Sequence, residues 1–172
     1  MTKHRIFRAR PLRALAAALA IVAASLAAAA PQASAELMEC NYEVGTFNAC
    51  LSTEAFHFGW FDARVGIDVY LPEQWSREII ACGARFKASL RGDDGKGAND
   101  QVIRQLSLVP GWPVASSAGI SAEFIGPDLR GSDLDEDKGS DTDEPYARIS
   151  YYDCHTGLTR EFVSGVLKGR WG

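Results

Sequence analysis

The sequence predicts an all-β protein: a small antiparallel β-sandwich of about seven or eight strands with one short helix, stapled by disulfides. Apolar and polar residues alternate over several short segments, which is the pattern of strands with one buried face and one wet face. Turn-forming residues separate these segments at short intervals, as in sandwiches and barrels. The 4 cysteines of the chain fit an exported domain of this kind.

The clearest strand is 61–71, FDARVGIDVYL, in which every second residue is apolar. The residues between them include Asp62, Arg64 and Asp68, which are available for charge pairs across the sheet. The segment 84–90 repeats the alternation. Both segments therefore belong to an antiparallel sheet with one buried face.

The remaining elements follow from turn signals. Further strands are expected at 39–44, 47–52, 102–109, 120–125, 146–154 and 158–167. The last two form the best hairpin candidate, and 155–157 makes the turn between them. The only helix expected is 72–83, because it has Pro near its start, acidic residues in its first turn and Gly at its end.

Residues 1–35 are typical of a secretory signal peptide. A basic start is followed by the apolar run 14–30 and by Ala33-Ser34-Ala35, which fits a small-residue cleavage site. The alternative is an uncleaved membrane tether. We expect cleavage, so that 36–172 is a single secreted, extracellular domain that carries an acidic loop at 128–145.

Removal of the signal changes the charge balance. The chain has 18 Lys and Arg against 22 Asp and Glu, and all the acidic residues lie after residue 35. Five basic residues lie before it, so 36–172 carries a net charge of about −9. Nucleic acid and anionic membranes are excluded as partners, because phosphate binding needs clustered Lys and Arg. After residue 35 the sequence has no second long apolar run, so we expect no membrane insertion once the signal is removed.

The cysteines Cys40, Cys50, Cys82 and Cys154 allow three disulfide connectivities, and the sequence does not choose among them. We favour Cys40 with Cys50, which staples the N-terminal segment, and Cys82 with Cys154, which ties the middle to the last hairpin. A zinc site is the weaker interpretation, since the chain has no CxxC pair.

The acidic segment SDLDEDKGSDTDE contains carboxylates at the spacing of calcium ligands. Counted as a twelve-residue loop, positions 1, 3, 5, 9 and 12 are Asp133, Asp135, Asp137, Asp141 and Glu144. These positions resemble the ligand positions of an EF-hand loop. Calcium takes six to eight oxygen ligands, which closely spaced carboxylates supply.

The segment departs from an EF-hand in its backbone. Lys138 stands at the position that needs Gly for the sharp turn, and Pro127 and Pro145 flank the loop where the helices should be. An EF-hand fold is therefore excluded. Two interpretations stay open: a calcium site carried by a loop, and a solvated acidic loop.

A second acidic loop, RGDDGKGAND, supplies Asp93, Asp94 and Asp100 between two expected strands. It loosely resembles the calcium loops of C2-like sandwiches, although it lacks their spaced Asp pair. The alternative is a Gly-rich hairpin turn. If both acidic loops lie at one end of the domain, a shared calcium site is the prediction.

Catalytic signals are weak. After residue 35 the histidines are His57 and His155, and no G-x-S-x-G motif is present. Acidic residues occur in nearly every loop, but nothing selects a pair of them as acid and base. We assign no catalytic residue. The aromatic stretch 56–61 has two interpretations, an exposed platform for a sugar or peptide and a strand that enters the core.

The function expected from these observations is that of a secreted, non-catalytic binding module, with calcium as an optional structural ion and an extracellular protein or glycan as partner. A secreted protease inhibitor is one alternative, with 108–117 or the Cys40–Cys50 loop as the presented segment. A hydrolase that uses loop carboxylates is another, and it would need a cleft with facing acids.

Overall fold

A computed structural model of the chain describes residues 37–92, 100–135, 144–169 and 171. Within them, a 9-stranded antiparallel sheet is accompanied by two short helices. The elements in chain order are β1 (Leu37–Glu43), β2 (Phe47–His57), β3 (Trp60–Val69), α2 (Glu73–Ala81), β4 (Phe86–Gly92), β5 (Val102–Leu108), β6 (Val114–Ser116), β7 (Gly119–Arg130), α3 (Gly131–Leu134), β8 (Pro145–Asp153) and β9 (Leu158–Val163). The prediction of a small, disulfide-stapled all-β fold is confirmed.

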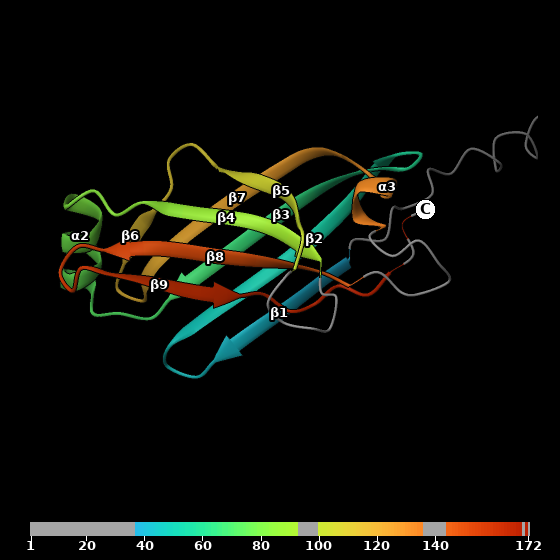
Figure 1. Cartoon of the computed structure of the whole chain (residues 1–172). Helices are drawn as coiled ribbons and strands as arrows, with labels where there is room; N and C mark the ends of the chain where they lie inside the picture. The colour runs from blue at the N-terminus through green and yellow to red at the C-terminus, as the bar shows by residue number, and fades with distance from the viewer. Residues whose placement is uncertain (1–36, 93–99, 136–143, 170, 172) are drawn as a thin grey trace, which may run out of the picture. The chain divides into compact units, whose positions relative to one another are not determined.

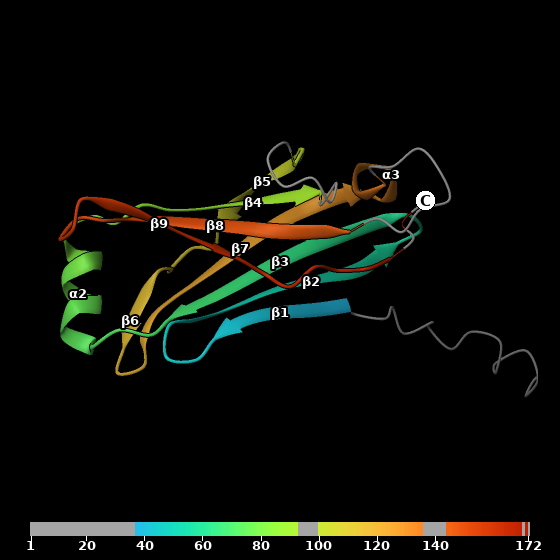
Figure 2. The same ribbon diagram turned by 60° about the horizontal axis from the view of Figure 1, so that its bottom comes forward.

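The strands follow one hydrogen-bonded path in the order β1-β2-β3-β7-β5-β4-β8-β9, and β6 pairs with β7. The turning point is β5, because Leu106 pairs with β4 whereas Ser107 and Leu108 pair with β7. The sheet therefore curls, and β4, β8 and β9 form a layer over β1, β2, β3 and β7 (Figures 1 and 2).

The two ends of this path approach each other. The Asn41 side chain in β1 donates a 3.2 Å hydrogen bond to the carbonyl of Val163 in β9. Just after β9, Gly165 lies so close to β1 that a Cβ on it would be 2.8 Å from the backbone nitrogen of Cys40. Only a residue without a side chain allows this contact, so Gly165 closes the curl.

The core lies between the layers and consists of the inward residues that the alternation predicts. Along β3 these are Ala63, Val65, Ile67 and Val69. The opposite layer contributes Phe86, Ala88, Leu90, Ala147, Ile149 and Tyr151. Each fully buried large apolar side chain contributes about 1.5–3 kcal/mol relative to an exposed one, so this alternation is the main source of stability.

The helix predicted at 72–83 is present as α2, at one end of the layers (Figure 1). It buries Ser76 and Ile79 and contacts β6 and β7. Its exposed face carries the Glu73–Arg77 ion pair at 2.5 Å, one helical turn apart. The amphipathic pattern of the segment is therefore satisfied by packing on the sheet.

Both disulfides join the cysteines in the favoured pairs. Cys40 and Cys50 face each other across β1 and β2, with a Cα–Cα distance of 4.0 Å. Cys82 follows α2 directly and is bonded to Cys154 in the turn between β8 and β9. The second bridge thus fixes the helix to the last hairpin.

One strand departs from expectation. The sequence predicts a strand that ends at 125, because Gly126-Pro127 is typical of a turn, but β7 continues to Arg130. The register of β3 and β7 shifts at this place, and the amide of Asp128 donates to the Asp62 carboxylate at 3.2 Å. Pro127 has no amide hydrogen to donate, and a bulge is a place where a strand accommodates such a residue.

The start of the acidic loop 128–145 is also more ordered than expected. Its first residues end β7, and the next four form the one-turn helix α3. The amide of Arg130 donates to the Asp133 carboxylate at 3.0 Å, which stabilises the first turn of this helix. Residues 136–143 lie outside the described part of the chain.

Candidate functional site

An apolar cleft opens at the α2 end of the two layers. We call it the mouth cleft. It has a volume of about 280 Å³ and is lined by Gly45, Thr46, Val69, Tyr70, Leu71, Trp75, Ile79, Tyr151, Asp153, Thr156, Arg160 and Phe162. These residues come from the β1–β2 turn, the end of β3, α2 and the β8–β9 hairpin. Mouths of curled sheets are common positions for ligands, because strands fix the walls while turns vary.

The floor of the mouth cleft is formed by Tyr151 and Phe162, which belong to a longer row of aromatic rings between the layers. Phe47 lies 5.1 Å from Phe162 between ring centroids, and Phe162 lies 6.0 Å from Tyr151. Tyr151 stacks on Phe86 at 4.9 Å. Rings at these distances stabilise one another beyond their buried area, so the floor is apolar and rigid.

The rim of the cleft exposes further aromatic surface. Trp75 on α2 is 58% exposed and Tyr70 after β3 is 40% exposed. A neighbouring open hollow of about 550 Å³ shares Tyr70 and extends over the β1–β2 turn, where Tyr42 and Val44 are exposed. Clustered exposed apolar side chains are typical of surfaces that meet a partner.

The polar wall of the cleft is built around Asp153, at the end of β8. Its buried carboxylate accepts hydrogen bonds from the Thr156 hydroxyl at 2.8 Å and the His155 amide at 3.0 Å. Burial alone would raise the pKa of Asp153, but these hydrogen bonds and the charge of Arg160 outweigh burial and lower it. Asp153 is therefore an anion that holds the turn through Thr156 and His155.

The buried Tyr151 is uncharged in this environment. Burial raises the pKa of the Tyr151 phenol, and the neighbouring charge of Asp153 raises it further. The cleft thus combines neutral aromatic rings with one exposed cation, Arg160. This combination suits an apolar or aromatic group with a hydrogen-bond acceptor beside it.

The two histidines do not supply catalytic machinery in the cleft. His155 pairs with Glu78 of α2 at 3.2 Å on the surface, and the adjacent Cys154 is in a disulfide. His57 lies at the far end of β2 and stacks on Phe56. Neither histidine lines the mouth cleft.

Among the candidate calcium ligands, Asp100, Asp133, Asp135 and Glu144 fall in the described residues. Asp133 accepts the Arg130 amide and lies 3.9 Å from Arg104, while Glu144 pairs with Lys168 at 2.9 Å. The described residues contain no group of three or more His, Cys, Asp or Glu that could hold a metal.

Asp100 has a different environment. One carboxylate oxygen accepts a hydrogen bond from the Tyr146 hydroxyl, and the other is buried with no hydrogen-bond partner among the described residues. Asp93, Asp94, Asp137 and Asp141 lie outside the described residues. A shared calcium site therefore stays a prediction.

Each of the two interpretations of the aromatic stretch 56–61 fits one part of it. Phe58 is fully exposed at the β2–β3 turn, whereas Phe61 packs against Trp171 with ring centroids 5.2 Å apart. The mouth cleft itself was missed, because Tyr70, Trp75 and Arg160 come from separate segments. The available signal was Trp75, a large apolar residue that α2 leaves exposed at 58%.

No helix in the described residues is both long and apolar enough to span a bilayer. No family model matches the chain, and the searches of curated proteins and of solved structures found no similar protein.

Proposed function

We propose that the protein is a secreted binding module that receives an apolar side chain of an extracellular polypeptide in its mouth cleft. The observation that carries the proposal is the aromatic floor under a rim of exposed rings, with Arg160 beside it. Tyr, Trp and Arg are the residues in which binding energy concentrates at protein interfaces. The signal-like start and the two disulfides support an extracellular location.

The size of the cleft favours one inserted group. Its 280 Å³ is just below the range of about 300–1,000 Å³ that is usual for whole small-molecule ligands. The open hollow beside it, over Tyr42 and Val44, offers room for the rest of a chain. We therefore expect a peptide that inserts one side chain and lies across the β1–β2 turn.

The alternatives gain less support. An inhibitor presents an extended exposed loop, but the segment between Cys40 and Cys50 is a tight hairpin whose strands pair throughout. The other suggested segment, 108–117, contains β6, which is already paired with β7. A hydrolase needs two facing acids in a cleft, and Asp153 is the only acid that lines the described mouth cleft.

The test is selection of a displayed random peptide library on the mature protein, followed by affinity measurement of the selected peptides. We expect peptides that share an aromatic or large aliphatic residue. Trp75→Ala should weaken them about tenfold or more, since loss of one interface aromatic typically costs over 1 kcal/mol. Phe58→Ala removes a fully exposed ring from the β2–β3 turn, outside the mouth cleft, and is the control.

Unchanged affinity in Trp75→Ala and in Arg160→Gln would refute the site. A glycan would be the ligand of the cleft instead if two results were found together. The library would yield no peptide binder, and the protein would bind neutral oligosaccharides in a way that Trp75→Ala abolishes. Inhibition of a serine, cysteine or metalloprotease below micromolar concentration would replace the proposal with the inhibitor.

A further inference from the structure

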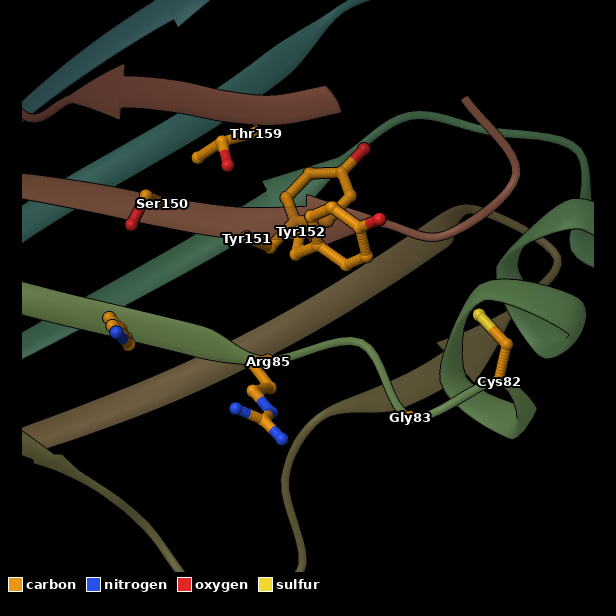
Figure 3. Close-up of a pocket in the computed structure, with 8 residues that line it drawn as sticks. Cys82, Gly83, Arg85, Ser150, Tyr151, Tyr152 and Thr159 are labelled. Atoms are coloured by element: carbon orange, nitrogen blue, oxygen red, sulfur yellow. The ribbon is translucent and has the colours of Figure 1, made fainter. Parts of the chain in front are cut away.

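A second concave site lies on the opposite side of the last hairpin, on the outward face of β4, β8 and β9. We call it the outer groove. It has a volume of about 460 Å³, and its main side chains are Arg85, Lys87, Ser150, Tyr152 and Thr159. Figure 3 shows Arg85, Ser150, Tyr152 and Thr159 along the strands, with Cys82 and Gly83 at one end. Tyr151 lines both hollows, and none of the other groove residues lines the mouth cleft.

The strand register explains why these side chains meet. Lys87 is directly opposite Ser150 in the β4–β8 ladder, and Tyr152 is opposite Thr159 in the β8–β9 ladder. The Tyr152 amide donates to the Arg85 carbonyl at 3.3 Å, which places Arg85 beside Tyr152. Residues two apart on a strand are separated by about 7 Å and face the same side, so Arg85 and Lys87 form a short cationic row.

This row continues beyond the groove. Ser89 and Arg91 follow on β4, and Arg148 is opposite Ser89 on β8. The Arg91 guanidinium donates to the Ser89 hydroxyl at 3.3 Å and to the Asp100 carbonyl at 3.2 Å, so it is engaged within the protein. Arg85 and Lys87 are the cations that line the outer groove itself.

No acidic side chain lines the outer groove. Neither Arg85 nor Lys87 has an acidic partner within 4.0 Å in the described part of the chain. The nearest outward acid on β9 is Glu161, which is opposite Ser150 on the side away from β4. The two cations are exposed, so their charge is directed to solvent and to any anion there.

The opposite outer face of the molecule has the reverse charge. On β2, β3 and β7 the outward side chains include Glu54, Asp62, Asp68 and Glu123. Arg64 on that face is paired with Glu123 at 3.5 Å. Surface charges more than about 8 Å apart are largely screened at physiological salt, so the outer groove attracts anions although the chain as a whole is acidic.

We propose that the outer groove binds an acidic glycan, a polysaccharide whose sugars carry carboxylates. The Arg85 guanidinium suits a carboxylate because its planar donors can form two parallel hydrogen bonds, and Lys87 supplies a second charge. The hydroxyls of Ser150 and Thr159 can exchange hydrogen bonds with sugar hydroxyls. The half-exposed Tyr152 ring offers a flat apolar surface for the C–H face of a sugar ring.

The test is titration of the mature protein with polygalacturonate, with neutral dextran as the uncharged polymer. We expect binding to polygalacturonate that weakens as salt is raised, and none to dextran. Arg85→Gln and Lys87→Gln should each reduce the affinity about tenfold, the usual loss for one charged hydrogen bond. Tyr152→Ala should weaken binding as well, which a purely electrostatic attraction would not require.

Arg64→Gln is the matched control, because it removes the same charge from the opposite face. If Arg64→Gln loses as much binding as Arg85→Gln, the outer groove is not the binding site. Dextran sulfate that binds more tightly than polygalacturonate, with no effect of Tyr152→Ala, would show simple charge attraction and overturn the carboxylate assignment. If the protein alone self-associates and Arg85→Gln abolishes this self-association, the occupant of the outer groove would instead be the acidic face of a second copy.

Discussion

Gly92 and Pro145 are directly opposite each other in the β4–β8 ladder. The first acidic segment follows Gly92 in the sequence, and the second ends at Glu144, just before Pro145. The two segments are therefore attached to the sheet at neighbouring points. Asp100 lies at the same end, bonded to Tyr146 through one oxygen while its other oxygen is buried without a partner in the part of the chain that the structure describes. Both acidic segments are thus anchored at one end of the layers, which was the condition for a shared calcium site.

The first prediction is that calcium stabilises the protein. At a 50-fold excess of calcium over its dissociation constant, we expect the free energy of unfolding to rise by about 2 kcal/mol. Scanning calorimetry of metal-free protein, with and without millimolar calcium, measures this as a rise in melting temperature. Magnesium should give less, because it demands tighter octahedral geometry. An unchanged melting temperature would leave only the solvated-loop interpretation.

Asp100→Asn provides the specific variant for this prediction. It keeps the size of the side chain but removes the charge next to Tyr146. We expect the calcium response to fall, because the buried oxygen then carries only the partial charge of an amide. Glu43→Gln removes an exposed carboxylate from the end of β1, next to the mouth cleft and away from the acidic loops, and should leave the response intact.

The second prediction concerns the two disulfides. Cys82–Cys154 spans 72 residues, whereas Cys40–Cys50 spans 10. In the chain-entropy view, a bridge that closes a longer loop restricts the unfolded chain more, so the double serine variant of Cys82 and Cys154 should lose about 4 kcal/mol and that of Cys40 and Cys50 about 3 kcal/mol. Urea unfolding of both variants measures the difference, and a larger loss from the Cys40–Cys50 variant would contradict it.

Much of the fold could be predicted because strand alternation is a local signal. The inward residues of β3 and β8 are those that the period of two selects, and the β8–β9 hairpin turns at the expected residues. β6 and α3 were missed because three or four residues are too few to show a period. The end of β7 was predicted wrongly because Gly126-Pro127 is typical of a turn. The bulge that accommodates Pro127 involves Asp62 in another strand, which the local sequence does not show.

The functional surfaces were less predictable because they are assembled across strands. Lys87 and Ser150 are far apart in the sequence, and only the β4–β8 register makes them neighbours. Trp75 and Phe162 likewise meet at the mouth cleft through the curl of the sheet. The acidic loops attracted attention in the sequence because their ligand spacing is local, whereas register is set by the whole fold.

The third prediction concerns pH. Asp153 has a lowered pKa in the folded protein, so its ionised form stabilises the fold above the unfolded pKa of about 4. This contribution is lost as the pH falls through the lower, folded pKa. Asp153→Asn should cost about 1–2 kcal/mol at pH 7, because the hydrogen bonds from Thr156 and His155 then end on a neutral group.

Urea midpoints of the wild type and Asp153→Asn, measured between pH 7 and pH 2, check this sign. The gap between the two proteins should be constant near neutrality and should narrow below about pH 4. Glu161→Gln, which removes an exposed carboxylate from β9, controls for the general change in net charge. A gap that widens toward low pH would contradict the role given to Asp153.

The last prediction concerns Trp171, near the C-terminus. This side chain is only 6% exposed and meets Phe61 edge to face at 5.2 Å, while its backbone carbonyl lies against Gly131 at the start of α3. Trp171→Ala should therefore cost about 3–5 kcal/mol, the usual loss for a buried aromatic. The indole nitrogen is buried and has no hydrogen-bond partner in the described part of the chain, so Trp171→Phe, which keeps the ring contact and removes that nitrogen, should cost clearly less. Trp75→Ala is the control, because a tryptophan that is 58% exposed should change the urea midpoint little. Equal losses from Trp171→Ala and Trp75→Ala would show that the C-terminal segment does not anchor β3 and α3.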